Sequence, residues 1–193
     1  MVFSDIDIKL LKDITEYASV TNRTTLLGID GLSGSGKSTL AAKLNETINS
    51  SYKITLDDFY RPVPKTGTYQ EAYNSYLEWQ RLENSVLIPL INNLEAVYRR
   101  RDWNTNMLTE WCTVQPRGTV IVEGVYTTIP ELLPYLDFSI FVDTPKSERL
   151  NRLHKREYRD MDWIAQWTAV EDWYIEHFQP DCYVNLVISG FQQ

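Results

Sequence analysis

The residues best suited to chemistry lie between Gly31 and Ser38, where the chain reads GLSGSGKS. This run satisfies the phosphate-binding pattern G-x-x-x-x-G-K-[ST] at every fixed position. Its glycines allow the backbone to curl into a nest of N–H donors around phosphate groups, and the helix that follows adds its positive dipole. In such a loop Lys37 reaches the outer phosphates and the Ser38 hydroxyl binds Mg²⁺. The predicted contacts with a nucleoside triphosphate are Gly31, Ser33, Gly34, Ser35, Gly36, Lys37, Ser38 and Thr39.

Acidic residues stand directly after three short apolar runs of the chain, at Asp57, Glu123 and Asp143. A carboxylate beside a triphosphate can hold Mg²⁺ or accept the proton of an attacking hydroxyl. Glu123 has the position of a Walker-B acid, so we assign it to the metal ion. Asp57 is the candidate general base. Because Asp also favours helix N-caps, a cap is the alternative for Asp57, and we interpret Asp58 and Asp143 as caps.

Four arginines recur at intervals of three, four and three residues and therefore share one stripe of a predicted helix. They are Arg149, Arg152, Arg156 and Arg159. In an acidic chain this concentration of positive charge favours a lid at about 145–160 that closes over the triphosphate. Arg152 and Arg156 would then stabilise the phosphoryl group during its transfer. The alternative is a solvated helix face whose charges contribute little.

Aromatic and basic residues directly after Asp57 indicate where an acceptor molecule would bind. Phe59, Tyr60 and Arg61 would stack against a flat molecule; the alternative is a hydrophobic staple with Arg61 exposed. The predicted acceptor contacts are Asp57, Tyr60, Arg61, Trp79 and Arg81. Further aromatic residues recur at helical spacing and are interpreted as core packing: Tyr69, Tyr73, Tyr76, Trp163, Trp167, Trp173 and Phe178.

Strands and helices must alternate to position these residues. Short apolar runs that are rich in β-branched and aromatic residues predict buried strands at 25–29, 52–56, 119–122, 138–142 and 183–188. Helical patterns lie at 4–20, 38–48, 70–82, 86–101, 130–135 and 145–178, the last with a break near 160–162. This alternation predicts an α/β fold with a parallel sheet and helices on both faces. Residues 61–118 show no strong strand and are assigned to a substrate-side insertion.

Length and composition favour one domain over residues 1–193. The chain has 193 residues, is 43% hydrophobic and carries a formal net charge of −7, which disfavours sequence-independent binding of nucleic acid. Two cysteines cannot form a disulfide framework, and no run of 18 apolar residues exists. We therefore expect a reduced, cytoplasmic protein that does not bind membranes; self-association stays open.

Four motifs together resemble the uridine kinase and phosphoribulokinase family of P-loop kinases. They are GLSGSGKSTLA at 31–41, LDDFYRP at 56–62, VIVEGVY at 120–126, and VDTP with Arg-Leu-x-Arg at 142–152. The resemblance implies a three-layer P-loop NTPase fold with a helical lid, and ATP with Mg²⁺ as cofactors. It places Asp57 at the catalytic-base position of the family's Asp-x-Phe-Tyr motif and Glu123 at the Walker-B-like position. It also implies catalytic roles for Lys37, Arg152 and Arg156.

One family feature is missing from this chain. Nucleoside kinases of the family usually carry a stretch of the form Asn-Phe-Asp-His-Pro after the base motif, whereas residues 73–82 contain no histidine. The chain is more similar to the short uridine kinase-like branch, and we expect a small-molecule kinase acting on a nucleoside or similar metabolite. The alternatives are a non-catalytic nucleotide-binding regulator, or a kinase for a non-nucleoside alcohol such as pantothenate or a phosphosugar. A GTPase is disfavoured because Asn-Lys-x-Asp is absent.

Overall fold

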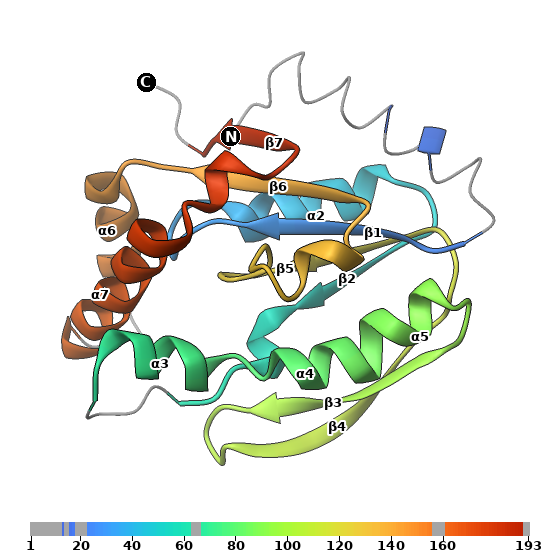
Figure 1. Cartoon of the computed structure of the whole chain (residues 1–193), viewed down its shortest axis with the longest axis horizontal. Coiled ribbons are helices and arrows are strands. Elements are labelled where there is room, and N and C mark those ends of the chain that lie inside the picture. Colours follow the sequence, from blue (N-terminus) through green and yellow to red (C-terminus); the bar gives the residue numbers. More distant parts are fainter. Residues whose placement is uncertain (1–12, 14–15, 18–22, 63–66, 156–160, 191–193) are drawn as a thin grey trace.

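The computed structural model describes residues 13, 16–17, 23–62, 67–155 and 161–190 (Figure 1). The predicted helix at 4–20 lies largely outside this part. Within it, five parallel strands form the central sheet in the order β2-β5-β1-β6-β7. These strands are β1 (Thr25–Asp30), β2 (Ser51–Thr55), β5 (Thr119–Glu123), β6 (Phe138–Asp143) and β7 (Leu186–Ser189). The predicted parallel sheet is confirmed, and each predicted strand is present with shifted ends.

Both faces of the sheet are covered, because the central strands β1 and β5 are buried at every residue. Leu27 of β1 faces the helix α2 (Lys37–Thr47), where it packs with Leu40 and Leu44. Its neighbour Leu26 faces the opposite side and joins the larger hydrophobic core. A continuous apolar run is therefore needed in β1, since alternate residues face different helical layers. The three-layer arrangement predicted from the sequence is confirmed.

The second layer and the carboxyl edge of the sheet are built from helices and short turns of helix. They are α3 (Tyr69–Tyr76), α4 (Trp79–Leu82), a π-helical turn (Glu83–Leu87), α5 (Ile88–Ile91), α6 (Lys146–His154) and α7 (Met161–Phe178), with 3-10 turns at Leu56–Phe59, Leu133–Tyr135 and Pro180–Cys182. Figure 1 shows α6 and α7 at the carboxyl edge of the sheet, with α7 beside α3. α6 ends at His154 and α7 begins at Met161, so the predicted break near 160–162 falls at the start of α7, and residues 156–160 lie outside the described part. The predicted helix at 130–135 is only a 3-10 turn.

The segment 61–118 differs from the prediction, because it contains two strands. β3 (Ala96–Asp102) and β4 (Met107–Val114) pair in an antiparallel hairpin, so the predicted helix at 86–101 is wrong beyond Ile91. The chain turns at Asn93, whose φ is 56°, and β3 then alternates between buried and exposed residues. Three consecutive arginines concealed this alternation, because long basic side chains fit either a helix surface or a half-buried strand.

Two sequence-based expectations concern compartment and membrane binding. Of the helices that the structure describes, none combines the length and apolar character that a membrane crossing requires. Cys112 is buried and Cys182 is exposed, and neither forms a disulfide.

Candidate active site

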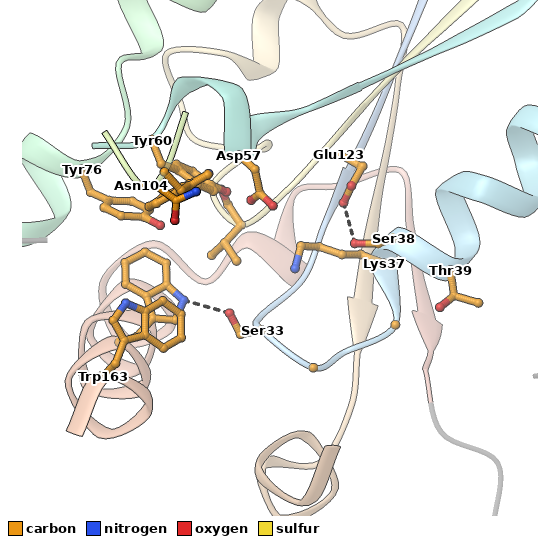
Figure 2. A pocket seen from close by; sticks show the side chains of 15 residues that line it. Ser33, Lys37, Ser38, Thr39, Asp57, Tyr60, Tyr76, Asn104, Glu123 and Trp163 are labelled. Carbon is orange, nitrogen blue, oxygen red and sulfur yellow. Dashed lines mark hydrogen bonds between the residues drawn. The ribbon is translucent and has the colours of Figure 1, made fainter. Parts of the chain in front are cut away.

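A cavity of about 670 Å³ lies at the carboxyl edge of the sheet, where the predicted phosphate-binding loop meets an aromatic wall (Figure 2). Loop residues Ser33, Gly34 and Gly36–Thr39 line one side. Asp57 and Glu123 extend into it from the ends of neighbouring strands, as expected for a parallel sheet. The structure thus brings together the loop, the candidate base and the candidate metal ligand.

The loop has the backbone conformation that its glycines permit. Gly34 and Gly36 have φ values of 80° and 105°, which side-chain-bearing residues rarely adopt. A Cβ atom on Gly34 would also lie 2.6 Å from the carbonyl oxygen of Arg149. α2 begins directly after Gly36, so its free N–H groups and positive dipole face the cavity. This cradle fits a triphosphate, and Lys37 extends into the cavity beside it (Figure 2).

Ser38 and Glu123 form the candidate metal site. The Ser38 hydroxyl donates a hydrogen bond of 3.0 Å to Oε2 of Glu123, which is 4% exposed at the end of β5. Hydroxyl and carboxylate oxygens suit Mg²⁺, which usually takes one or two protein ligands together with phosphate oxygens and water. In the described part of the chain no cluster of three or more His, Cys, Asp or Glu groups could hold a metal alone. The two oxygens therefore fit a magnesium ion that is shared with a triphosphate.

Asp57 and Asp58 are neighbours with opposite surroundings. Asp57 is exposed, lines the cavity and points toward Lys37 (Figure 2). Asp58 is buried and accepts hydrogen bonds from the Tyr98 hydroxyl (3.2 Å) and Arg100 Nε (3.3 Å) of β3. Burial raises the pKa of the Asp58 carboxyl, and the charge of Arg100 opposes this shift. The prediction that Asp58 is a helix cap is wrong, because Thr55 caps the 3-10 turn and Asp58 anchors the hairpin.

Asp143 also differs from its predicted role. The N-cap position of α6 is Pro145, where no side-chain capping hydrogen bond is present. Asp143 is exposed and lines a second cavity of about 520 Å³. The prediction that Asp143 caps the following helix is therefore wrong.

Aromatic side chains form the wall of the cavity opposite the loop. Tyr60 stacks on Tyr76 with ring centroids 4.4 Å apart, and Tyr76 lies 4.2 Å from Trp167. Trp163 continues the wall, stacked on Trp167 at 6.2 Å. The Tyr60 hydroxyl donates to the carbonyl of Val125 at 2.7 Å, and burial raises its pKa well above the ordinary value. The wall is thus flat, apolar and held rigidly.

The hairpin contributes two further residues to this wall. Trp103 and Asn104, in the turn after β3, also line the cavity, and Figure 2 shows Asn104 beside Tyr76. The interpretation of Tyr76, Trp163 and Trp167 as core packing is incomplete, because these rings line the cavity as well as the core. Only the fold shows this, since helical spacing looks the same for both roles.

Three predicted acceptor residues lie away from the cavity. Arg61 and Arg81 both pair with Glu78, at 2.7 Å and 2.9 Å, and Trp79 packs against the hydrophobic core. Arg81 also covers the Phe59 ring at 4.2 Å and donates to the carbonyl of Arg99. We therefore correct the assignment of Arg61, Trp79 and Arg81, because none of the three lines the cavity and the partners of both arginines lie outside it. Phe59 is fully buried under Arg81 and cannot stack on an acceptor.

The arginine stripe divides into two parts. Arg152 donates to the carbonyl oxygens of Gly34 (3.1 Å), Ser35 (3.2 Å) and Gly190 (3.0 Å), so it supports the loop from outside the cavity. Arg149 is 3% exposed and pairs with Glu171. Arg156 and Arg159 lie outside the described residues, and their part in a lid stays a prediction.

Comparison with known proteins adds an independent line of information. A family model described as "AAA domain" matches residues 27–172. The uridine kinase of Borrelia duttonii (strain Ly) is 29% identical over 149 residues, which cover 68% of this chain and 66% of that protein. The uridine kinase of Saccharomyces cerevisiae is 28% identical over 185 residues, 84% of this chain and 36% of that protein. The chain thus spans slightly less than two thirds of the Borrelia relative.

Solved structures share the fold. A possible uridine kinase from Bacillus stearothermophilus superposes with a TM-score of 0.71 at 23% identity, covering 95% of this chain and 99% of that one. A putative fructose transport system kinase from Silicibacter sp. TM1040 gives 0.67 at 19% identity, covering 93% and 97%. A D-glycerate 3-kinase from Cryptococcus neoformans gives 0.64 at 13% identity, covering 98% and 97%. The α/β P-loop fold is therefore common to kinases with different acceptors.

Proposed function

Since this chain belongs to the AAA-domain family of P-loop proteins, and within it to the uridine kinase-like kinases, we propose that it transfers the γ-phosphoryl group of ATP to a hydroxyl of a small molecule. The observation that carries the proposal is the arrangement of Asp57 and Lys37. They point toward each other in one cavity, between a phosphate-binding loop and an aromatic wall (Figure 2). A purely regulatory nucleotide site has no need of an exposed carboxylate at this place.

The loop and its neighbours would hold the donor. The N–H groups at the start of α2 and the Lys37 ammonium bind the outer phosphates, which positions the γ-phosphoryl group for attack. Ser38 and Glu123 would hold a magnesium ion, directly or through water. When bound, that ion neutralises charge on the β- and γ-phosphate oxygens.

Asp57 would act as the general base. Its carboxylate accepts the proton of the acceptor hydroxyl while the hydroxyl oxygen forms a bond to the γ-phosphorus. The bond between that phosphorus and the bridging oxygen breaks at the same time, and ADP leaves with the electron pair. The 3-10 turn at Leu56–Phe59 holds Asp57 beside the loop, and Asp58 anchors this turn to the hairpin.

The wall indicates the chemistry of the acceptor. Tyr60, Tyr76, Trp163 and Trp167 offer flat apolar surface, and the Asn104 amide adds a hydrogen-bonding group. Among the described residues that line the cavity, Lys37 is the sole cation, and in the proposed complex its charge is paired with the triphosphate. A carboxylate or second phosphate on the acceptor would thus find no cationic partner among these described residues. We infer a neutral, ring-bearing alcohol of the nucleoside type rather than pantothenate or a phosphosugar, with residues 61–118 supplying Tyr76 and Asn104.

Release of ADP measured against a panel of acceptors tests the proposal. The panel contains uridine, cytidine, adenosine, fructose, D-glycerate, pantothenate and a pentose phosphate, each with MgATP. We expect a neutral nucleoside to stimulate ADP release most and the three anionic compounds to give no stimulation. Tight binding of ATP without stimulation by any hydroxyl compound would instead favour the non-catalytic regulator. Preference for an anionic acceptor would overturn the inference drawn from the wall.

A further inference from the structure

Ser33, at a variable position of the phosphate-binding loop, is held on all three of its polar groups. Its N–H donates to Oε1 of Glu171 at 2.9 Å, and its hydroxyl oxygen accepts from Nε1 of Trp167 at 2.8 Å. Its carbonyl oxygen accepts a longer bond of 3.4 Å from Arg149. Trp167 and Glu171 are one turn apart on α7, whereas Arg149 lies on α6. Two helices that follow the loop by more than 100 residues thus hold one loop residue.

The burial of these partners shows that the contacts are specific. Glu171 is fully buried, and Trp167 and Arg149 are each 3% exposed. A buried carboxylate is unfavourable unless it is paired and hydrogen-bonded, and burial raises the pKa of Glu171. Arg149, at 3.3 Å, supplies the opposite charge. An apolar residue at this position of α7 would avoid the free energy of desolvating a carboxylate. The hydrogen bond to Ser33 therefore gives a physical reason for a carboxylate here.

Trp167 belongs to the acceptor side of the cavity as well. Its ring contacts Tyr76 at 4.2 Å and Trp163 at 6.2 Å, and both of these rings line the cavity. Its indole Nε1 donates to the Ser33 hydroxyl oxygen, and Trp167 itself lines the cavity. One side chain therefore touches the loop with its polar edge and the acceptor space with its flat face. A change at either end displaces the same rigid ring.

We propose that Ser33, Trp167 and Glu171 form a latch that couples the phosphate-binding loop to the acceptor wall. This inference rests on the proposed function, because it assumes that both sides of the cavity bind substrates. Glu171 and Ser33 act as positioning residues. Their contact fixes the loop relative to α7, and it thereby fixes the orientation of the Trp167 ring toward the acceptor. By thermodynamic reciprocity, nucleotide bound at the loop tightens acceptor binding and acceptor tightens nucleotide binding by the same factor. We expect about three- to tenfold, which is the range of one hydrogen bond.

The latch can be tested by fluorine NMR without knowledge of the acceptor. The six tryptophans are labelled as 5-fluorotryptophan, and the Trp167 signal is assigned from the Trp167→Phe variant. The probe is Mg²⁺ with a non-hydrolysable ATP analogue, and calorimetry measures its binding independently. We expect the analogue to shift the Trp167 signal in the wild-type protein. Ser33→Ala, which removes only the hydroxyl, should abolish most of this shift while the analogue still binds.

Trp173 provides the matched control on the same helix. It packs on Tyr73 and His177 away from the cavity, and its signal, assigned from Trp173→Phe, should stay in place. Calorimetry separates the two proposals. Failure of the wild-type protein to bind the analogue would overturn the proposed function and the latch with it. Binding without a shift of Trp167, or a shift that persists in Ser33→Ala, would overturn the latch alone.

Glu171 supplies a second test of the same idea. Glu171→Gln keeps an acceptor for the Ser33 N–H and removes the charge, whereas Glu171→Ala removes both. We expect the Trp167 shift to persist in Glu171→Gln and to be lost in Glu171→Ala, provided that circular dichroism shows both variants folded. If Glu171→Ala is unfolded, the Ser33→Ala result decides. Equal, wild-type shifts in folded Glu171→Ala and Glu171→Gln would contradict the role of the carboxylate.

Discussion

The hydroxyl of Ser38 and the carboxylate of Glu123 lie 3.0 Å apart, although 85 residues separate them in the chain. β1 leads into the loop that carries Ser38, and β5 ends at Glu123, and the two strands pair with Ile29 opposite Glu123. The register of one strand pair therefore brings the two oxygens together. The proposed metal site therefore depends on how these two strands are paired.

Removal of the Glu123 charge should weaken magnesium binding. In Glu123→Gln the amide keeps a hydrogen-bond acceptor for Ser38 but lacks the negative charge that a hard cation prefers. We expect the Mg²⁺ concentration for half-maximal ADP release to rise at least about tenfold, with a smaller effect on binding of ATP without metal. An unchanged magnesium dependence would remove Glu123 from the metal site.

Lys37→Ala should abolish transfer. The structure places this lysine in the cavity beside the loop, and in the proposed mechanism it contacts the outer phosphates. We expect calorimetry to show a larger loss of affinity for ATP than for AMP, because AMP lacks those phosphates. Near-normal turnover by this variant would show that the loop is not the active site.

Asp57→Asn and Asp58→Asn form a matched pair that tests the base. Asp57→Asn should keep ATP binding and lower kcat by roughly 10²–10⁴-fold, the range that general acid–base catalysis supplies. Asp58→Asn should change kcat much less, because Asp58 faces the hairpin. Steady-state kinetics with the acceptor found in the panel measures both. Equal kcat values for the two variants would contradict the assignment of Asp57.

Arg152→Ala should raise the Kd for MgATP about tenfold, because its guanidinium holds two loop carbonyls in place and a charged hydrogen bond contributes about 1.5–3 kcal/mol. Glu148→Gln is the control, since Glu148 pairs with Nε of Arg152 at 2.8 Å, whereas the loop carbonyls accept from Nη1. A loss of kcat with unchanged Kd would favour instead the direct role in transfer that the sequence predicts.

The stability of Asp58→Asn relative to the wild-type protein should depend on pH. The pKa of Asp58 is raised above its ordinary value of 3.8, mainly by burial, so the folded protein holds this proton more tightly than the unfolded chain does. The contribution of Asp58 to stability is therefore greatest below pH 3.8 and falls as the pH rises through the raised pKa. In urea unfolding, the advantage of the wild-type protein over Asp58→Asn should shrink as pH rises from about 4 to 7. A growing advantage would contradict this sign.

The sequence alone determines the phosphate-binding loop, because its chemistry depends on adjacent residues. The glycines, Lys37 and Ser38 are local neighbours, and the strand before them and the helix after them follow from short apolar patterns. The same holds for the position of Asp57 and Glu123, since each follows a buried strand and parallel strands end at one edge. The family resemblance rests on these local motifs, and the matching family model covers residues 27–172.

Only the tertiary structure decides whether a residue in or beside a motif faces the cavity or packs against another part of the fold. Asp57 and Asp58 look equivalent in the sequence, yet one lines the cavity and the other binds the hairpin. The sequence predicts a helix at 86–101, where the structure has most of β3, because the arginines in this strand hide its alternation. Helical spacing predicts only core packing for Trp167, whereas the fold places both Trp167 and Glu171 against Ser33. Contacts between residues more than 100 positions apart depend on how layers pack, and a local pattern carries no information about that packing.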